Sequence, residues 1–442
     1  MCGGDGDPPP DMLDGLASLV DKSLALQLQG AAGEARFGML EPIREYGLER
    51  LAASGEEAEA RRAHAAYHLD LAERAEPAFK GPDSLAWLAR LEAEHNNVRA
   101  ALDWARETGA IEVGLRLVGA LRDFWWRRSY LVEGRGRLEG LLALAQSDAD
   151  VAPAVRAKAL NAAGLLAYWQ NNYGPATAHL DEGARLYRSL GDTIMTADTL
   201  SLAGGVAREQ GRYERATVLL EECVRISLGT GDAWHLGSAL YVLGQVARDQ
   251  GDFAGAARRY EEVLSIAHEV DPWGTAVGLY LLGSVRVDQG DLAGATALLE
   301  ETLPVIHGAG DKVTAAKALE SLARVAARRG NEALARERYK DSLVLFGEAG
   351  EQLYSIVSVE GMARLDLDAR PARAARLLGA AAARRAALGA PLPPVDRPDH
   401  DRAVGKARAV LGDEAFAAAW VVGQTLTLDA AIDEALAHDN AT

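Results

Sequence analysis

Apolar residues recur at the helical spacing i, i+3, i+4 and i+7 through the middle of the chain, in pairs of segments joined by short turns. The pattern repeats at about 40 residues, and five registers agree. The first segment of each pair contains a small residue, which is Gly164, Gly204, Gly244, Gly283 or Ala323. The turns contain Asn171, Gly211, Gly251, Gly290 and Gly330. Each unit is therefore predicted to be a hairpin of two helices.

A single hairpin of this kind cannot bury its own apolar face, so neighbouring hairpins have to stack. The sequence thus predicts an all-α chain whose main part is an α-α superhelix, with five repeats in residues 151–352. The small residue is expected to let the first helix approach its partner closely. Weaker traces of the pattern predict a helical connector with a degenerate repeat in residues 56–150. They also predict a degenerate repeat and a helical C-terminal cap in residues 353–442.

The N-terminal part has a different pattern. Residues 1–11 are rich in Gly, Pro and Asp, which predicts disorder. In residues 12–55, a helical segment is followed by two strand-like segments, 24–29 and 35–39, and by a second helix that begins near Pro42. Helix, hairpin and helix in this order are the outline of the last part of a winged-helix domain.

The repeats resemble the tetratricopeptide repeat. The resemblance rests on the small residue of the first helix, on the Gly-x-Tyr turn of residues 211–213 and on the alanine at Ala216. The period is longer than the usual length of roughly 34 residues, so the helices are expected to be extended. The resemblance implies a superhelix whose first helices line a concave groove.

Segments on both sides of the repeats resemble parts of bacterial signal-transduction ATPases with numerous domains (STAND). This group includes NB-ARC proteins and LuxR-type or AfsR-like transcriptional regulators. The segments are residues 19–24, 36–46, 62–68, 91–104, 375–380, 389–394 and 416–420. The resemblance implies that the chain is the C-terminal sensor half of such a bacterial regulator.

The phosphate-binding Gly-x4-Gly-Lys-Ser/Thr loop of those ATPases does not occur in this sequence, and neither does a terminal helix-turn-helix signature. No nucleophile–base pair or metal-ligand motif points to an enzyme. We therefore expect a non-enzymatic module without cofactor or metal. An ATPase or DNA-binding domain is expected upstream or on another polypeptide.

Composition and charge narrow the class of partner. The 442 residues include 64 acidic and 47 basic side chains, a net charge of −17. Phosphate contacts need clustered Lys and Arg, so direct nucleic-acid binding is disfavoured. The two cysteines, Cys2 and Cys223, exclude a disulfide scaffold, and Cys223 is expected to pack as a small apolar residue. No apolar run reaches the ~18 residues of a membrane span, and a cytoplasmic location is expected.

Three local motifs suggest chemistry, and a structural role is favoured for each. His64 and His68 have the spacing of two metal ligands, but no third ligand is close in sequence. Residues 124–130 combine aromatic rings and arginines, as proteins that bind single-stranded nucleic acid do. Their place in a degenerate repeat favours core packing instead. Residues 11–22 carry one Lys against three Asp, which disfavours DNA contact.

The charged clusters are interpreted as solvated helix faces. Adjacent acids such as Glu221 and Glu222 point ~100° apart on a helix, so they do not form a catalytic pair. Asp181 and Arg185 have the spacing of an ion pair within one helix. The one basic cluster is also expected on a solvated face, with an anionic partner as the alternative. It consists of Arg370, Arg373, Arg376, Arg384 and Arg385.

The concave groove is the strongest candidate for a binding site. Its inward positions, counted from the small residue, carry Tyr and Arg, which binding surfaces favour. The candidates are Asn161, Tyr168, Ser201, Arg208, Tyr241, Gln245, Arg248, Tyr280, Ser284, Glu320 and Arg324. The alternative is a wall that is polar because it faces water.

These features predict a sensor that binds a small ligand or a protein partner in the groove and shifts an equilibrium elsewhere. The rival hypothesis is a constitutive scaffold for the assembly of protein complexes, without ligand switching. A stabilising small ligand favours the sensor, whereas binding of protein partners alone favours the scaffold.

Overall fold

The structure is a computed structural model that describes residues 10–29, 35–79, 83–145, 151–267 and 272–437. The chain divides into two compact units, Met1–Leu166 and Ala167–Thr442, and each is described by itself. Most of the segment predicted to be disordered, residues 1–9, lies outside the described residues, and Pro10 begins the first helix.

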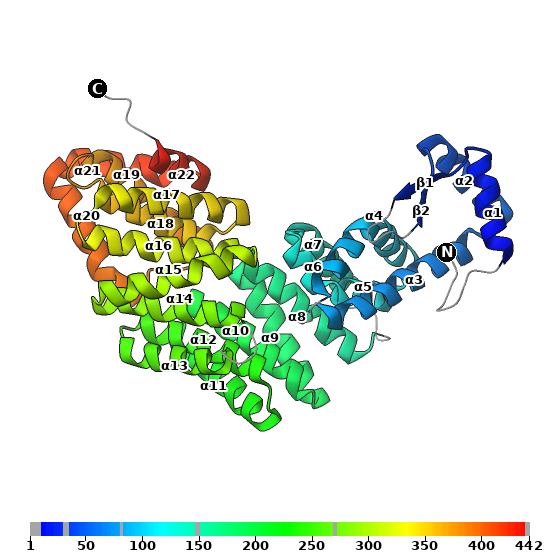
Figure 1. Cartoon of the computed structure of the whole chain (residues 1–442), viewed down its shortest axis with the longest axis horizontal. Coiled ribbons are helices and arrows are strands. Elements are labelled where there is room, and N and C mark those ends of the chain that lie inside the picture. The colour runs from blue at the N-terminus through cyan, green and yellow to red at the C-terminus, as the bar shows by residue number, and fades with distance from the viewer. Residues whose placement is uncertain (1–9, 30–34, 80–82, 146–150, 268–271, 438–442) are drawn as a thin grey trace. The chain divides into compact units, whose positions relative to one another are not determined.

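The first unit is helical over its described residues except for one two-stranded hairpin (Figure 1). Strands β1 (Leu26–Gln29) and β2 (Ala35–Gly38) are antiparallel, and the turn between them lies outside the described residues. Helix α1 (Pro10–Asp21) precedes the hairpin and α2 (Glu41–Ser54) follows it, in the predicted order. The remaining helices are α3 (Glu57–Ala78), α4 (Ser84–Thr108), α5 (Ile111–Ala120), α6 (Arg122–Arg127), α7 (Leu131–Ala145) and most of α8 (Pro153–Trp169).

Aromatic side chains form part of the core of the first unit. Phe124 and Trp125 are fully buried, and their rings lie 5.4 Å apart between centroids. The prediction of core packing is confirmed for these two residues, whereas Trp126 is 36% exposed. The predicted histidine pair is also engaged within the fold: Nδ1 of His68 lies 2.8 Å from the carbonyl oxygen of His64, and Nε2 lies 3.4 Å from Glu94.

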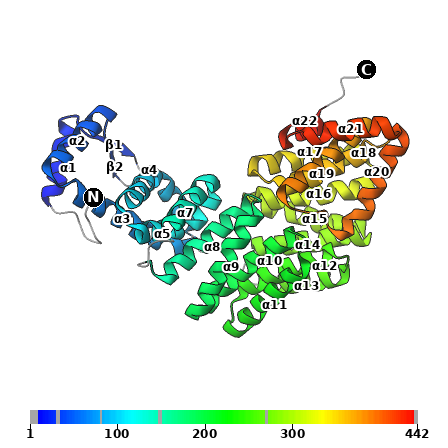
Figure 2. The same cartoon turned by 180° about the vertical axis from the view of Figure 1, so that it is seen from behind.

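The second unit is a stack of helical hairpins that ends in a helical cap (Figures 1 and 2). After the end of α8 come α9 (Tyr173–Leu190), α10 (Thr193–Glu209), α11 (Tyr213–Thr230), α12 (Ala233–Asp249), α13 (Phe253–Ala267), α14 (Pro272–Gln289), α15 (Leu292–Gly308), α16 (Lys312–Arg328) and α17 (Glu332–Ala349). The cap contains α18 (Gln352–Leu365), α19 (Pro371–Leu388), the short 3-10 helix η2 (Pro394–Asp396), α20 (Arg397–Leu411), α21 (Asp413–Thr425) and α22 (Leu428–Leu436). The predicted all-α superhelix is confirmed. In the described part of the chain, no helix combines the length and the apolarity that crossing a membrane requires.

The Gly-Asp pairs of the sequence end one helix and begin the next. Gly191 and Gly231 adopt left-handed backbone conformations, with φ of 71° and 73°, at the ends of α9 and α11. Each following aspartate caps the next helix, because its carboxylate accepts a backbone N–H from the first turn. Asp192 accepts from Met195 at 3.0 Å, and Asp232 accepts from His235 at 3.1 Å. These corners fix where each hairpin begins.

The small residue of each first helix faces a large side chain of the second helix. A Cβ atom added to Gly204 would overlap Leu220, and one added to Gly244 would overlap the ring of Tyr260. Leu220 and Tyr260 are buried. The predicted close approach of the two helices at this position is therefore confirmed.

Charged residues of the second helices pair between hairpins. Asp181 on α9 accepts from Arg215 on α11 at 2.5 Å, and Arg188 on α9 donates to Glu222 on α11 at 2.7 Å. The predicted pair of Asp181 with Arg185 in one helix is therefore wrong. The reason is that stacking brings the two second helices within reach, a proximity that spacing along one helix does not reveal.

The basic cluster of α19 is not a solvated face, and that prediction is wrong. Arg373 is buried and pairs with Asp366, and Arg376 pairs with Glu434 of α22. Helices α20 to α22 fold back over α19, and α22 supplies Glu434, whereas Asp366 lies in the connection between α18 and α19. The approach is closest where α19 meets α21, because a Cβ added to Gly379 would lie 2.5 Å from the carbonyl oxygen of Trp420.

Cys223 packs as the sequence predicts. Its side chain is fully buried, and Sγ lies 3.2 Å from the carbonyl oxygen of Ala197. Burial raises the pKa of the Cys223 thiol to about 11. The thiol is therefore protonated at neutral pH and acts as an apolar group.

The buried side chain of His235 bridges two carboxylates, one on α10 and one at the start of α12. Nδ1 lies 2.5 Å from Asp232 and Nε2 lies 3.2 Å from Asp198. Burial lowers the pKa of His235, but the hydrogen bonds to both carboxylates outweigh burial, and the pKa is raised above its usual value. The stabilisation is full below pH ~6.5, where the unfolded histidine is also protonated, and is lost as pH rises through the folded pKa.

Replacing His235 with Gln is therefore expected to lower the free energy of unfolding by about 1 kcal/mol at pH 6, because two carboxylates lose their cation. The loss should shrink at pH 9. Urea denaturation of both proteins at the two pH values measures it. The matched control is His307→Gln, because His307 is an exposed histidine on α15. An equal loss at both pH values would show that His235 acts by packing alone.

Candidate functional site

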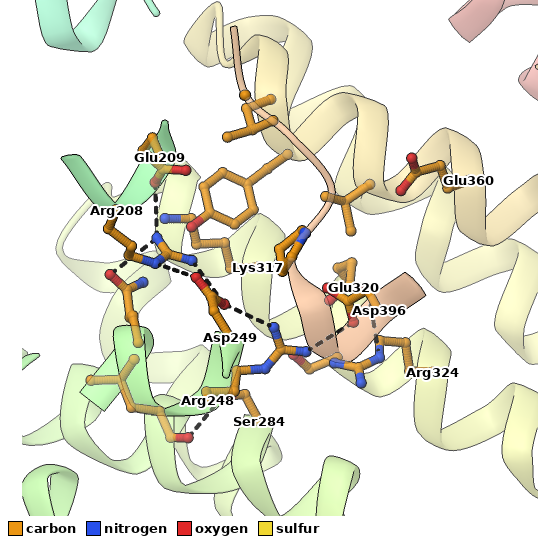
Figure 3. Close-up of a pocket in the computed structure, with 18 of the residues that line it drawn as sticks. Arg208, Glu209, Arg248, Asp249, Ser284, Lys317, Glu320, Arg324, Glu360 and Asp396 are labelled. Atoms are coloured by element: carbon orange, nitrogen blue, oxygen red, sulfur yellow. Dashed lines mark hydrogen bonds and ion pairs between the residues drawn. The ribbon is translucent and has the colours of Figure 1, made fainter. Parts of the chain in front are cut away.

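The first helices of successive hairpins line one cavity in the second unit (Figure 3). Side chains from α10, α12, α14, α16 and α18 form its walls. We call this surface the inner groove. Its lining includes Arg208, Glu209, Gln245, Arg248, Asp249, Tyr280, Ser284, Lys317, Glu320, Arg324, Tyr354, Glu360, Arg364 and Arg385. Residues between α19 and α20 also line it, and the remaining cavity measures about 120 Å³.

Arginines and acids of neighbouring hairpins form a ladder along the groove. Arg208 on α10 donates through Nε to Asp249 on α12 at 2.7 Å. Arg248 on α12 donates through Nε to Asp288 on α14 at 2.6 Å, and Arg324 on α16 donates to the same carboxylate. In each pair the donor and the acceptor come from neighbouring hairpins. The ladder therefore fixes the register between consecutive repeats.

The acids of this ladder are buried. Asp249 and Asp288 expose only 2% and 5% of their side chains. Burial raises the pKa of Asp288, but Arg324 and Arg248 outweigh burial and lower the pKa to about 2. Because these arginines are already neutralised, they stabilise the wall of the groove and are not its free cations.

Two other basic side chains of the groove have no such partner. Nζ of Lys317 lies 3.8 Å from the centroid of the Tyr354 ring, a cation–π contact. Nε of Arg364 is buried without a hydrogen-bond partner among the described residues. Within the part of the chain that the structure describes, neither side chain forms an ion pair. An anionic group that enters the groove would meet two cations that no ion pair holds.

The structure brings together seven of the eleven residues predicted to line the groove. They are Arg208, Gln245, Arg248, Tyr280, Ser284, Glu320 and Arg324. Tyr241 lies directly behind this lining and accepts a hydrogen bond from Gln245 at 3.1 Å. Ser201 is buried against Ser238 at 2.8 Å, and Tyr168 packs in a core cluster with Tyr173. Asn161 belongs to the first unit, where it accepts from Arg122 at 2.7 Å.

Four kinds of groove residue were not predicted from the sequence. Asp249 follows Arg248 directly in the chain, and Glu209 follows Arg208 in the same way, so a recurring Arg-acid pair was a visible signal. Lys317 lies one turn before Glu320 on α16. Tyr354 and Arg364 lie on α18, where the repeat pattern is degenerate. The residues between α19 and α20 gave no signal for the groove, because they are not part of any repeat.

The tetratricopeptide repeat family matches residues 196–228 and 236–270. These two segments are tetratricopeptide repeats. They cover most of the hairpins α10–α11 and α12–α13, which supply Arg208, Gln245, Arg248 and Asp249 to the groove. The resemblance inferred from the small residue and the turn is therefore confirmed for this part of the chain.

Curated relatives from Mycobacterium share part of the sequence. The proteins named "Putative HTH-type transcriptional regulator Rv0890c" of Mycobacterium tuberculosis and "Putative HTH-type transcriptional regulator Mb0914c" of Mycobacterium bovis are each 37% identical over 163 residues. The match covers 36% of this chain and 18% of each relative. The chain thus corresponds to less than a fifth of the length of these relatives.

Solved structures share the fold. A STAND protein with a tetratricopeptide repeat sensor from Pyrococcus horikoshii matches with a TM-score of 0.53 and 17% identity, over 91% of this chain and 59% of that protein. The Rap conjugation gene regulator of the plasmid pLS20, in complex with the Phr* peptide, matches with a TM-score of 0.50 and 12% identity. That match covers 79% of this chain and 97% of the regulator. At these identities the likeness shows the fold alone.

Proposed function

We propose that the inner groove binds an extended peptide, either free or as a segment of a protein partner. The observation that carries this proposal is the pair of cations without an ion pair, Lys317 and Arg364, in a groove whose other basic side chains are paired with acids. Buried cations of this kind favour carboxylates, because charge-assisted hydrogen bonds are stronger than neutral ones. Tyr280 and Tyr354 add ring surface against which peptide side chains pack.

We also propose that this module is the sensing part of a transcriptional regulator of the STAND type. The names of the mycobacterial relatives and the STAND protein of similar fold support this placement. The ATPase and DNA-binding steps would then belong to other domains or polypeptides. Peptide binding would shift the regulator between two states by binding one of them more tightly. The Rap regulator of similar fold, solved with a peptide, supports the class of ligand.

Selection from a random decapeptide library on the immobilised full chain is expected to enrich acidic sequences. Arg364→Ala should weaken the binding of selected peptides about tenfold or more, because a charge-assisted hydrogen bond contributes about 1.5–3 kcal/mol. Lys317→Ala should have a similar effect. Fluorescence anisotropy with labelled peptides measures both dissociation constants. Neither side chain forms an ion pair, so both variants are expected to keep the fold.

Arg402→Ala is the matched control for these variants. Arg402 lies on α20, outside the groove lining, and exposes 75% of its side chain. Its replacement is expected to leave the dissociation constants unchanged. Peptides that bind Arg364→Ala and Lys317→Ala as tightly as the unmodified chain would show that the inner groove is not the binding site. A selection that enriches no peptide would contradict the proposed ligand class.

A further inference from the structure

The connection between α19 and α20 lines the inner groove. Residues 389–396, with the sequence GAPLPPVD, join α19 to α20. Figure 3 shows Asp396 of this segment facing Arg248 across the pocket. Pro393 has φ of −55° and ψ of 145°, the polyproline II conformation that peptide grooves recognise. Pro393 therefore has the backbone of a bound peptide, and it leads directly into the 3-10 helix η2 at Pro394–Asp396.

Three contacts hold this segment in the groove. Ala390 is 1% exposed and packs in a cluster with Tyr173, Val206 and Leu353. The Pro391 ring lies so close to Gly211 that a Cβ added there would lie 2.8 Å from Cγ of the proline. Asp396 lies 3.7 Å from Nη2 of Arg248.

The segment nearly fills the groove but uses few of its charges. The remaining cavity of about 120 Å³ is smaller than the ~300–1,000 Å³ of typical ligand pockets, so a peptide of several residues cannot enter beside it. Its one ion pair to the groove is long, and that carboxylate is 34% exposed. Lys317 and Arg364 form no ion pair with it. A peptide with carboxylates that reach these two cations would make charge-assisted bonds that the segment lacks.

We infer that residues 389–396 are an internal stand-in for the peptide partner, and that the partner is an extended, proline-containing acidic peptide that displaces them. This inference rests on the proposed function, because it requires that the groove bind a peptide. With a competitor on the same chain, the apparent affinity equals the intrinsic affinity multiplied by the fraction of time that the groove is free. Weakening the internal segment should therefore tighten the binding of an external peptide.

The first test uses a labelled acetyl-GAPLPPVD peptide and the full chain. In one variant, Pro391→Gly, Leu392→Ser, Pro393→Gly and Pro394→Ser are combined, which removes the proline-rich character at constant length. This variant is expected to bind the peptide at least tenfold more tightly than the unmodified chain. Asp396→Asn, a single change that removes only the ion pair to Arg248, is expected to tighten binding two- to fivefold. Asp399→Asn, on the exposed start of α20, is the matched control and should change nothing.

The second test follows the segment itself. Binding of a library-selected peptide to the unmodified chain is expected to speed amide hydrogen exchange at Leu392 and Val395. Unchanged exchange there, or equal affinity of the unmodified chain and both segment variants for acetyl-GAPLPPVD, would overturn the inference. If selected peptides still bind the groove in that case, the proposed function stands without the stand-in. If no peptide binds any of these proteins, the proposed function itself fails. If the variant with four substitutions does not fold, the affinity of Asp396→Asn and the exchange measurement test the inference instead.

Discussion

Replacement of Asp288 by Ala is expected to lower the free energy of unfolding by about 3–5 kcal/mol. Asp288 is 5% exposed and accepts from both Arg248 and Arg324. Its removal leaves two arginines in the wall of the groove without their shared carboxylate. Urea denaturation of the full chain at pH 7, followed by circular dichroism, measures the change.

The pH dependence of this effect provides its control. Because the folded pKa of Asp288 is lowered to about 2, the ladder stabilises the fold fully above the ordinary value of 3.8. The stabilisation is lost as pH falls through about 2. The difference between the unmodified chain and Asp288→Ala should therefore shrink between pH 4 and pH 2. Asp368→Ala, which removes an exposed partner of Lys406, is expected to cost less than about 1 kcal/mol. If Asp288→Ala and Asp368→Ala lower the free energy of unfolding equally, the ladder does not stabilise the fold.

Replacement of Gly244 by Ala is expected to destabilise the fold by about 2–3 kcal/mol, near the upper end for an overpacked core. The added methyl group would overlap three ring atoms of Tyr260, which is 1% exposed and has no room to move. The two helices of the hairpin α12–α13 would have to separate. Thermal unfolding and urea denaturation measure the loss.

Gly237 on the same helix is the matched control. A Cβ atom added there meets no atom within 4 Å. Gly237→Ala is therefore expected to be neutral or to stabilise by up to about 1 kcal/mol, because Ala favours the helix over Gly. If both substitutions have the same effect, close helix approach is not the reason for the small residue of the repeat.

The sequence was sufficient for those features that depend on local spacing. The hairpins follow from apolar periodicity, and their ends follow from Gly-Asp corners such as Gly231 and Asp232, because one residue ends a helix and the next caps another. The position of Gly244 predicted a close helix contact, which the ring of Tyr260 makes. Seven predicted groove residues also converge, because the inward face of each first helix repeats with the same period.

Features that depend on contacts between distant segments were not accessible in this way. Arg376 was expected to be solvated on its own helix, but Glu434 reaches it because α22 folds back over α19. Asp181 pairs with Arg215 on the neighbouring hairpin and not with Arg185 on its own helix. The entry of residues 389–396 into the groove depends on how α19 and α20 are placed, which no periodicity encodes.

The central claim is that the inner groove binds an extended peptide, and site-specific photo-crosslinking tests it most directly. The photoreactive residue p-benzoylphenylalanine replaces Tyr354 in the groove or, as the control, Val344, which is 45% exposed on α17 outside the groove lining. With a labelled library-selected peptide, the account predicts crosslinking at position 354, its suppression by excess unlabelled peptide, and none at position 344. Crosslinking at position 344 alone, or equally at both positions, would contradict it.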